Sequence, residues 1–459
     1  MSKKTTESAS DMVMENLIAL CKRRGFIFQG SEIYGGLAGT WDYGPLGVAL
    51  RNNIKRMWWK RFVDDREDMY GVDAAILMNQ RTWEASGHVN GFADPMVECK
   101  KCNAKFRADQ IGTLVEKDKS WQLPEACQHC KAKNSFDHPK QFNMMFKTHV
   151  GANQDSASIS YLRPETAQGM FVNFKNILDT FHPKLPFGMA QIGKAFRNEI
   201  APRDFTFRSR EFEQMEIEYF VDPRDAKHVT ETFEALYQEQ IAFLASLGLT
   251  SSKIHKIEVP ESDRAHYSKR SVDTEFDFPF GQKELLGIAY RTDFDLKAHS
   301  EASKVDLSYF DEETKERFIP HCIEPTFGVD RLTLAVLSDA YTEDELGGEK
   351  RIYLKLSPAV APVKVAVFPL LKNKPVLVEK AREIYQMLKK EFGAVAFDDN
   401  GNIGKRYRRQ DEIGTPFCIT IDFDTIEKDA GVTVRNRDTG EQERIAEKDL
   451  LAYLTKAGV

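Results

Sequence analysis

A pair of alternating segments joined by a polar turn is the feature that most constrains how this chain can fold. The second segment, residues 207–220, has the period of two that is typical of a strand. Because alternate side chains of a strand share a face, one face carries a mixed polar and aromatic set: Phe212, Gln214, Glu216 and Glu218. The first segment ends in Arg197 and Glu199. The pattern predicts an antiparallel hairpin with a charged, functional face.

Acids are unusual on the inner face of a sheet, where apolar side chains are the norm. Arginines there suit a polyphosphate, because the guanidinium fork matches phosphate oxygens. An aromatic side chain beside them suits a nucleotide base. The alternative is a surface hairpin held by ion pairs, which the pattern alone leaves open.

A second informative segment covers residues 324–337. An extended stretch passes through Gly328 into an apolar helix whose first turn carries Asp330 and Arg331. A positive charge near a helix start is poorly placed for the helix dipole. That mismatch indicates a task such as binding an anion, while a capped core helix with an exposed arginine is the plain alternative.

Seven cysteines include two pairs with knuckle spacing, Cys99 with Cys102 and Cys127 with Cys130. The odd number, and the absence of an apolar leader in the first ten residues, lead us to expect a reducing compartment. Four thiolates suit tetrahedral Zn²⁺, and incidental free thiols are the alternative. The surrounding residues 96–140 are rich in lysine and poor in long apolar runs, so we interpret them as an inserted module.

The net charge of −6 excludes a globally basic nucleic-acid binder but permits a local basic patch. No stretch approaches the roughly 18 consecutive apolar residues of a spanning helix, so we expect no membrane protein. Beyond a proline-containing boundary at 357–362, strands and helices alternate, which predicts a separate α/β domain. In it, basic residues gather around Tyr407: Lys405, Arg406, Arg408 and Arg409. They form either a phosphate-binding patch or a solvated helix face.

Local patterns also predict individual elements. Residues 11–24 are expected to form a helix with Ser10 as N-cap and Gly25 just past its end. A helix over 46–63 and a buried strand over 72–78 follow. In the C-terminal part the pattern predicts strands at 363–368, 394–397, 417–421 and 432–434, and helices at 376–392, from 404, and from 447.

The hairpin resembles motif 2 of class II aminoacyl-tRNA synthetases through Arg197, Glu199, Arg208, Phe212 and Glu216. Segment 324–337 resembles their motif 3 through Gly328, Asp330 and Arg331. Further matches at 30–36, 43–47, 163–169 and 404–412 make nearly the whole chain similar to the homodimeric glycyl-tRNA synthetase family. Motif 1 is the weakest match, because the strand after helix 46–63 lacks the usual proline.

The resemblance implies an α+β fold: an antiparallel sheet flanked by helices, a zinc-knuckle-like insertion and a C-terminal α/β anticodon-binding domain. The implied division is 11–95 and 141–360 for the catalytic domain, 96–140 for the insertion and 361–459 for the anticodon-binding domain. The implied reaction attaches glycine to tRNA(Gly) through glycyl-adenylate, releasing AMP and diphosphate. A homodimer in the cytoplasm is the expected setting.

Family roles carried onto this chain make Arg197 and Arg331 the catalytic residues. Arg197 is expected to contact the ATP α-phosphate and the glycine carboxylate, and Glu199 the adenine amino group. Phe212 and Arg331 are expected to enclose the adenine ring, Arg208 to reach the γ-phosphate and Glu284 to help hold Mg²⁺. The implied ATP-binding set is Arg197, Asn198, Glu199, Phe207, Arg208, Ser209, Arg210, Glu211, Phe212, Glu284, Leu285, Gly328, Val329, Asp330 and Arg331.

Glycine and alanine differ by one methyl group, which is worth only about 1–3 kcal/mol of contact energy. Selectivity must therefore come from exclusion, and a pocket crowded with polar side chains leaves no room for the methyl group. Thr326 replaces the serine expected in the family. The implied glycine-binding set is Arg107, Glu165, Phe212, Glu213, Gln214, Met215, Glu216, Arg291, Glu324, Pro325, Thr326, Phe327 and Gly328.

Several rival hypotheses deserve comparison. A prolyl or threonyl synthetase of the same subclass fits the acidic pocket less well. A non-catalytic paralogue is expected to lose motif side chains that are present here, and a zinc-dependent nucleic-acid module does not explain the hairpin.

Overall fold

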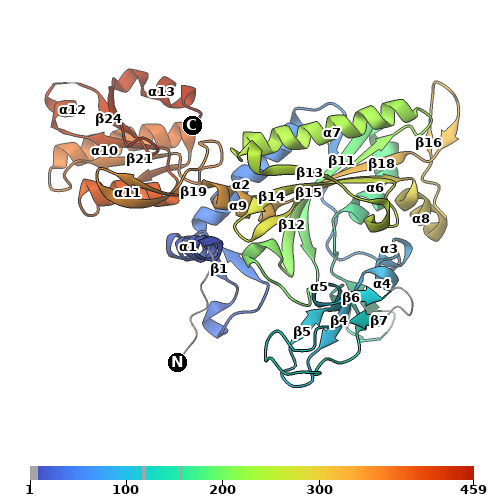
Figure 1. Ribbon diagram of the computed structural model, residues 1–459. Coiled ribbons are helices and arrows are strands. Elements are labelled where there is room, and N and C mark those ends of the chain that lie inside the picture. The colour runs from blue at the N-terminus through green and yellow to red at the C-terminus, as the bar shows by residue number, and fades with distance from the viewer. Residues whose placement is uncertain (1–8, 116–119, 156–157, 429) are drawn as a thin grey trace.

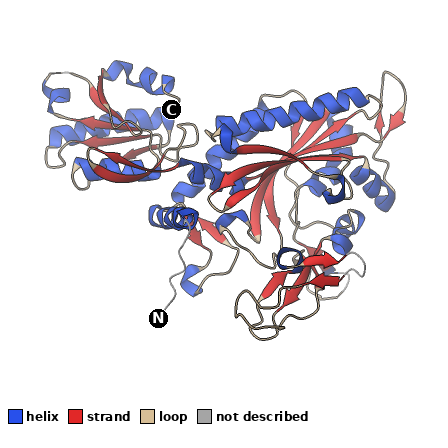
Figure 2. Cartoon of the chain, viewed as in Figure 1, coloured by secondary structure: helices blue, strands red, loops and turns tan. Residues whose placement is uncertain are grey.

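The computed structural model describes residues 9–115, 120–155, 158–428 and 430–459 (Figure 1). A large part is built around a seven-stranded sheet, and a smaller C-terminal part around a five-stranded sheet. A β-rich module projects from the large part (Figure 2). Among the described residues, no helix combines the length and apolar character needed to cross a membrane.

The first helix, α1 (Ala9–Arg24), begins before Ser10, so the prediction that Ser10 caps it is wrong. Its end is as expected: Gly25 has a φ of 76°, a conformation that glycine adopts without strain. The Phe26 amide donates to the Cys21 carbonyl oxygen at 2.8 Å, which completes a Schellman motif. This turn leads into a short hairpin of β1 (Ile27–Gln29) and β2 (Trp41–Tyr43).

The helix predicted over 46–63 is confirmed as α2 (Pro45–Trp59), continued by one wider turn over Lys60–Asp64. The strand predicted over 72–78 is wrong, since β3 (Met69–Gly71) ends before it. The Ala74 carbonyl oxygen accepts from the Arg163 guanidinium at 2.6 Å. This backbone oxygen is therefore bonded to a side chain and not to a neighbouring strand. The apolar character of this stretch reflects packing of Val72 on helix α6 (Ala167–Phe181).

The main sheet has the strand order β13-β14-β15-β18-β12-β11-β3. Every pair is antiparallel except β11 with β3 at the edge, which confirms the expected class II architecture. Its other strands are β11 (Phe187–Phe196), β12 (Glu211–Val221), β13 (Ile254–Glu258), β14 (Arg270–Phe278), β15 (Gly281–Thr292) and β18 (His321–Gly328).

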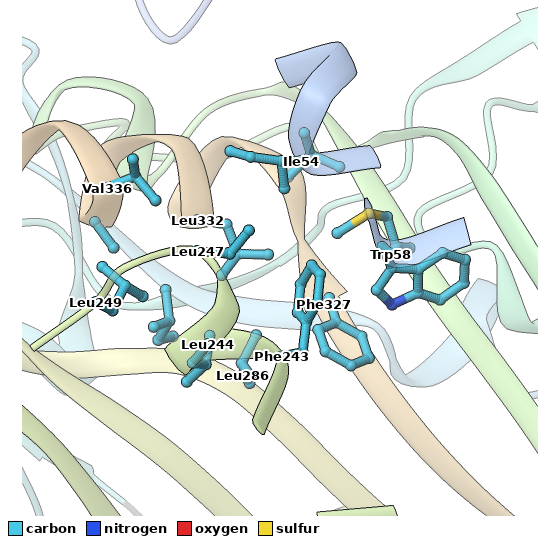
Figure 3. Close-up of a cluster of buried hydrophobic side chains, with 14 of the residues drawn as sticks. Ile54, Trp58, Phe243, Leu244, Leu247, Leu249, Leu286, Phe327, Leu332 and Val336 are labelled. Atoms are coloured by element: carbon cyan, nitrogen blue, oxygen red, sulfur yellow. The ribbon is translucent and has the colours of Figure 1, made fainter. Parts of the chain in front are cut away.

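One face of this sheet packs on the main hydrophobic core. Helices α2, α7 (Ala226–Ser246) and α9 (Val329–Ala340) cover it. Trp58 and Phe243 meet Phe327 there, with ring centroids 5.8 and 5.7 Å apart (Figure 3). The opposite face turns toward α6 and α8 (Phe294–Ser303), where a second cluster contains Phe171, Leu296 and Cys322. Between these helices the opposite face carries polar side chains.

The remaining elements of the large part are small. The β-rich module pairs β4 with β5 and β8, and β6 with β7. The bounds are α3 (Gln80–Ala85), α4 (His88–Gly91), β4 (Ala93–Glu98), β5 (Lys105–Arg107), α5 (Ala108–Ile111), β6 (Thr113–Val115), β7 (Ser120–Gln122), β8 (Lys140–Asn143), β9 (Lys147–His149), β10 (Ile159–Tyr161), β16 (Tyr309–Phe310) and β17 (Arg317–Phe318).

The C-terminal part has the strand order β22-β21-β23-β24-β25. Its elements are β21 (Val365–Pro369), α10 (Pro375–Phe392), β22 (Val395–Phe397), α11 (Ile403–Ile413), β23 (Phe417–Ile421), α12 (Phe423–Glu427), β24 (Val432–Asn436), β25 (Gln442–Ile445) and α13 (Leu450–Lys456). The predicted elements are present, and α12 and β25 were missed. Strand β25 is charged and mostly exposed, so it carries no alternating pattern.

A buried arginine joins the two parts. The hairpin of β19 (Tyr341–Leu346) and β20 (Glu349–Leu354) carries Arg351. Its guanidinium is 2% exposed and donates to Asp344 at 2.7 Å, to Asp411 of α11 at 3.2 Å and to the Arg437 carbonyl oxygen at 2.7 Å. Arg435 adds a bidentate pair to Asp411 at 2.8 and 3.0 Å. The C-terminal part is therefore docked by a network whose donors and acceptors are paired.

Candidate active site

The predicted hairpin is confirmed, and it forms the floor of a pocket. Strands β11 and β12 pair in the register Gly193 with Gln214 and Ala195 with Phe212. The Arg197 amide donates to the Arg210 carbonyl oxygen at 2.9 Å, which extends the pairing beyond the strands. Phe212 and Gln214 share a face, while Met215 points into the core.

The pocket gathers residues from β12, β15 and the start of α9 that lie far apart in the sequence. Arg331 lies over the Phe207 ring at 4.5 Å, and its guanidinium is 3.2 Å from the Glu284 carboxylate. Arg197 lies over the Phe212 ring at 5.4 Å. The lining residues are Arg197, Glu199, Thr206, Phe207, Arg208, Ser209, Phe212, Glu213, Gln214, Glu284, Leu285, Leu286, Gly287, Thr326, Gly328, Asp330 and Arg331.

Glu199 and Arg208 are paired in this pocket. Glu199 is 7% exposed, and its carboxylate accepts from the Arg208 guanidinium at 2.7 Å. Arg197 donates to the Pro164 carbonyl oxygen at 3.1 Å. Three guanidinium groups, those of Arg197, Arg208 and Arg331, and an adjacent aromatic ring make this pocket suitable for a nucleotide polyphosphate.

Asp330 lines the pocket, but its carboxylate is engaged by hydrogen bonds and an ion pair with other residues of the fold. It accepts from the Tyr43 hydroxyl at 2.5 Å and from the Glu213 amide at 2.7 Å, and Arg51 lies 3.4 Å away. Burial, and then the Asp330 charge, raise the pKa of Tyr43 well above its usual value. The network fixes the start of α9 to β2 and α2, and so positions Arg331.

Four members of the expected ATP-binding set do not line this pocket. Val329 lies in the core, and Glu211 is exposed and pairs with Lys194 at 2.8 Å. Arg210 donates to the Ala38 and Glu199 carbonyl oxygens at 2.6 and 3.0 Å. The Asn198 amide donates to the Met144 carbonyl oxygen at 2.7 Å. Asn198, Arg210 and Glu211 thus support the turn of the hairpin, while Val329 belongs to the core.

A buried cluster of acidic side chains, called the acidic pocket below, adjoins this pocket on the same sheet face. Gln214 and Thr326 line the nucleotide-type pocket and also contact Glu216, at 3.4 and 3.0 Å. Beyond them lie Glu165 and Glu324, which are 9% and 7% exposed. The sequence predicted that these three glutamates share a pocket, and the structure brings them together.

Arg291 is the guanidinium of this acidic pocket. It is 1% exposed and donates to Glu324 at 2.8 Å and to both oxygens of Asp295 at 2.7 and 2.8 Å. It also lies over the Tyr267 ring at 3.9 Å. The sequence reasoning missed Asp295, because Arg291 lies at the end of strand β15 and Asp295 in the first turn of helix α8, and no local period links side chains across that junction.

The glutamates of the pocket differ in how strongly their surroundings stabilise the ionised form. Burial raises the pKa of Glu165, but the charges of His88 at 3.3 Å and Arg291 outweigh it, so the net pKa is lowered. Burial raises the pKa of Glu216, and the Glu165 charge adds to the effect. Burial also raises the pKa of Glu324 to about 8 although Arg291 lowers it. The pocket thus concentrates negative charge that a substrate cation can neutralise.

Several residues of the expected glycine-binding set do not present side chains to this pocket. Met215 and Phe327 lie in the core on the opposite sheet face, and Pro325, two residues before Phe327 on β18, shares that face. Glu213 pairs there with Arg51 at 3.0 Å. Period-two alternation excludes these side chains from the face that carries Glu216, so including them was wrong.

Arg107, another member of this set, lies in the β-rich module. It pairs with Asp109 at 2.6 Å and with Asp94. Asp94 in turn lies 3.8 Å from Arg208. Arg107 is therefore linked to the nucleotide-type pocket through the Asp94 carboxylate and through the charge of Glu199.

The four paired cysteines meet in the β-rich module. Their sulfur atoms all lie within 4.8 Å of one another. The Sγ atoms of Cys99 and Cys130 are 3.7 Å apart, and those of Cys102 and Cys127 are 3.8 Å apart. A bond of about 2.3 Å from zinc to each sulfur places tetrahedral ligands about 3.8 Å apart. The donor set therefore fits a tetrahedral metal site.

The basic cluster of the C-terminal part lies on α11, but its members differ. Lys405 is exposed, and Arg408 and Arg409 are half-buried beside Glu349 and Asp398. Arg406 is 1% exposed and donates to carbonyl oxygens at Asp399 and Gly401 at 3.0 and 2.7 Å. The expectation that Arg406 contacts RNA is wrong, because its guanidinium is enclosed by backbone.

Comparisons with known proteins agree with this arrangement. A family model described as the tRNA synthetase class II core domain (G, H, P, S and T) matches residues 145–340. A model of an anticodon binding domain matches residues 364–457. A glycine–tRNA ligase of Geobacillus thermodenitrificans is 52% identical over 98% of this chain and 99% of its own. One of Alkaliphilus metalliredigens is 51% identical over 96% and 97%, and one of Clostridium tetani 50% identical over 97% and 98%.

Proposed function

The chain belongs to the glycine–tRNA ligase family of class II synthetases, and we propose that its two adjoining pockets carry the two halves of glycine activation. The enzyme attaches glycine to tRNA, with a class II core and an anticodon-binding domain. The nucleotide-type pocket takes ATP and the acidic pocket takes glycine. Their shared wall at Gln214 and Thr326 is the observation that carries this proposal.

In the ATP pocket, different side chains bind the adenine ring and the phosphates. Adenine lies between Phe212 and Arg331, since a guanidinium on one face and a ring on the other form a favourable cation–π sandwich. Arg208 leaves Glu199 to reach the γ-phosphate, and Glu199 then accepts from the adenine amino group. The Arg208–Glu199 pair at 2.7 Å thereby holds both side chains beside the site proposed for ATP.

The reaction itself needs positioning and charge neutralisation. The glycine carboxylate attacks the α-phosphorus in line, and diphosphate leaves. Arg197 contacts both the carboxylate and the α-phosphate, so it holds the reactants together and stabilises the negative charge that develops. Glu284, at the pocket edge, is suited to help hold the Mg²⁺ that class II synthetases use with ATP. No covalent bond to the enzyme is required.

In the acidic pocket, Glu216, Glu324 and Glu165 surround the glycine ammonium, and Arg291 fixes the orientation of the acids. A side chain on the substrate would displace these acids from their donors. Because the partners of Glu216 and Glu324 are buried, that displacement would leave polar groups unpaired. Glycine is selected because it alone has no side chain.

A crystal structure with a non-hydrolysable glycyl-adenylate analogue, 5′-O-(glycylsulfamoyl)adenosine, tests these assignments. We expect its adenine between Phe212 and Arg331 and its ammonium within hydrogen-bond distance of Glu216 and Glu324. An analogue whose amino group lies outside the acidic pocket would refute the glycine site and leave the ATP site standing.

Structural zinc at Cys99, Cys102, Cys127 and Cys130 is the second part of the proposal. The two turns that carry the pairs are alike: the Asn103 and Lys131 amides donate to the carbonyl oxygens of Cys99 and Cys127 at 2.8 and 2.9 Å. Four thiolates at tetrahedral spacing supply folding free energy when they bind zinc. The metal would hold the strands of the module together.

The zinc assignment predicts about one zinc per chain in protein purified without chelator. Replacing Cys127 by serine should remove that zinc and make residues 96–140 sensitive to protease. Cys418→Ala serves as the matched control, because Cys418 is a buried thiol of the C-terminal part. Elemental analysis that finds no zinc in the wild-type protein would contradict the proposal.

The third part assigns anticodon-stem binding to Lys405, Arg408 and Arg409. Their side chains line one surface hollow with Arg24, and clustered basic groups bind phosphates. The division of the chain that we adopt is 11–95 with 141–360 for catalysis, 96–140 for the metal module and 361–459 for the anticodon. The family also supports a homodimer in the cytoplasm.

Replacing Lys405 and Arg408 together by glutamate should lower kcat/KM for tRNA charging by about tenfold or more at low salt, because like charges repel the phosphates. Glycine-dependent ATP–pyrophosphate exchange should be unchanged. Point variants are preferable to deletion, since removing the domain would strip buried Arg351 of Asp411. Lys389→Glu with Lys390→Glu, on exposed positions of α10, is the control of equal charge. Equal loss of exchange would contradict the division of labour.

A further inference from the structure

A fourth buried glutamate, Glu218, lies in the acidic pocket and has no role in the reaction described above. Glu218 follows Glu216 by two residues on β12, so both side chains share a face. It is fully buried, and its carboxylate lies with those of Glu216 and Glu324 within 4.8 Å of one another. Three buried carboxyl groups this close cannot all be ionised in the absence of compensating cations.

Within the described parts of the chain, the groups around Glu218 supply one cation. Glu216 faces it from its own strand, Glu324 and Cys322 from β18, and Arg291 from β15. Arg291 already donates to Glu324 and to Asp295. The empty cluster therefore has more carboxyl groups than positive charges, and it must hold at least one proton.

The hydrogen bonds indicate which carboxyl group holds that proton. Both oxygens of Glu216 accept from hydroxyl groups, those of Thr166 and Thr326. Glu324 accepts from a guanidinium. Glu218 accepts only from the Cys322 thiol at 2.9 Å, a weak donor, and its Oε1 has no hydrogen-bond partner within the described parts of the chain. The donors thus stabilise charge on Glu216 and Glu324 but not on Glu218.

The electrostatic surroundings favour a protonated carboxyl group in this cluster, since burial also raises the pKa of Glu324 to about 8 although Arg291 lowers it. Burial, and then the Glu324 charge, raise the pKa of Glu218 well above its usual value. A neutral Glu218 also removes one of the like charges that oppose ionisation of Glu324.

We propose that Glu218 is a further substrate-binding residue of the glycine pocket, protonated when the pocket is empty and ionised when the glycine ammonium lies among Glu216, Glu218 and Glu324. The inference rests on the proposed glycine pocket and deepens it. The Glu218 O–H bond breaks, its proton passes to solvent, and the ammonium replaces the lost positive charge. The free Oε1 then gains an N–H donor.

The pH dependence of KM for glycine tests this proton release. Binding that releases one proton strengthens as pH rises, by up to tenfold per pH unit. In ATP–pyrophosphate exchange, the wild-type KM for glycine should therefore fall from about pH 6 to about pH 8, below the pH at which free glycine loses its ammonium proton. In Glu218→Gln, which keeps the neutral shape, KM should be nearly independent of pH and several-fold higher than wild type at the alkaline end.

Two outcomes would overturn the inference. A wild-type KM that does not change with pH contradicts proton release, whatever the variant does. A Glu218→Gln enzyme that keeps the full wild-type slope assigns the proton to another group. A purely structural role would alter the unfolding midpoint of Glu218→Gln but not the slope. Failure of the glycine pocket as a whole is distinguishable, because Glu324→Ala would then keep its exchange activity.

Discussion

Replacing Arg197 by alanine should lower kcat/KM for glycine-dependent ATP–pyrophosphate exchange by about a thousandfold, or roughly 4 kcal/mol of transition-state stabilisation. Arg197 comes from the end of β11 and lies over the Phe212 ring, and its side chain is half-buried. The loss combines two effects, because the guanidinium both aligns the carboxylate with the α-phosphorus and neutralises charge that grows during the attack.

Two variants separate these effects. Arg197→Lys keeps the positive charge but lacks the planar fork that can contact two groups at once, so we expect it to recover only part of the lost rate. Arg382→Ala is the matched control, since that guanidinium also lies over an aromatic ring, Phe397 at 3.5 Å, but in the C-terminal part. Exchange by a folded Arg197→Ala enzyme within tenfold of wild type would contradict the assigned role.

Replacing Glu324 by alanine should abolish glycine activation in the same assay. The change removes an acid from the ammonium site and leaves Arg291, which is 1% exposed, with Asp295 as its one ion partner among the residues that the structure describes. Breaking a buried pair destabilises a protein by about 3–5 kcal/mol, so the unfolding midpoint must be measured alongside the rate.

Glu324→Gln shows whether activity is lost because the negative charge is removed or because the protein does not fold. The amide keeps the size of the side chain and an acceptor for Arg291, while it removes the negative charge. We expect it to fold, and to need a much higher glycine concentration for exchange. Glu301→Ala on the exposed surface of α8 should behave as wild type. Pyrophosphate exchange at the wild-type rate in Glu324→Ala would refute the assignment.

Alternation within strands made the centre of the site predictable from the sequence. A period of two was enough to place Phe212, Gln214 and Glu216 on one face, and the structure has them there. The same rule would have excluded Met215 and Phe327, which were carried over with their neighbours although their side chains pack in the core. The alternation within the strands would therefore have predicted the glycine-binding side chains more accurately than the residues transferred from the family did.

Other features depend on contacts between distant segments, which no local pattern encodes. Arg406 reads as part of a basic surface, but the backbone carbonyls at Asp399 and Gly401 enclose it. Residues 72–78 have the apolar character of a strand, yet Arg163 takes the Ala74 carbonyl oxygen. Glu218 was placed on the correct face, but its missing hydrogen-bond partner becomes visible only when β18 packs beside it.

The central claim is that an acidic pocket selects glycine by leaving no space for a side chain. Amino-acid-dependent ATP–pyrophosphate exchange tests it most directly, with glycine, alanine, serine, proline and threonine compared at equal concentration. We predict exchange with glycine and a rate with alanine lower by more than the factor of about 200 that contact with one methyl group can supply. Comparable exchange with alanine or serine would contradict the claim.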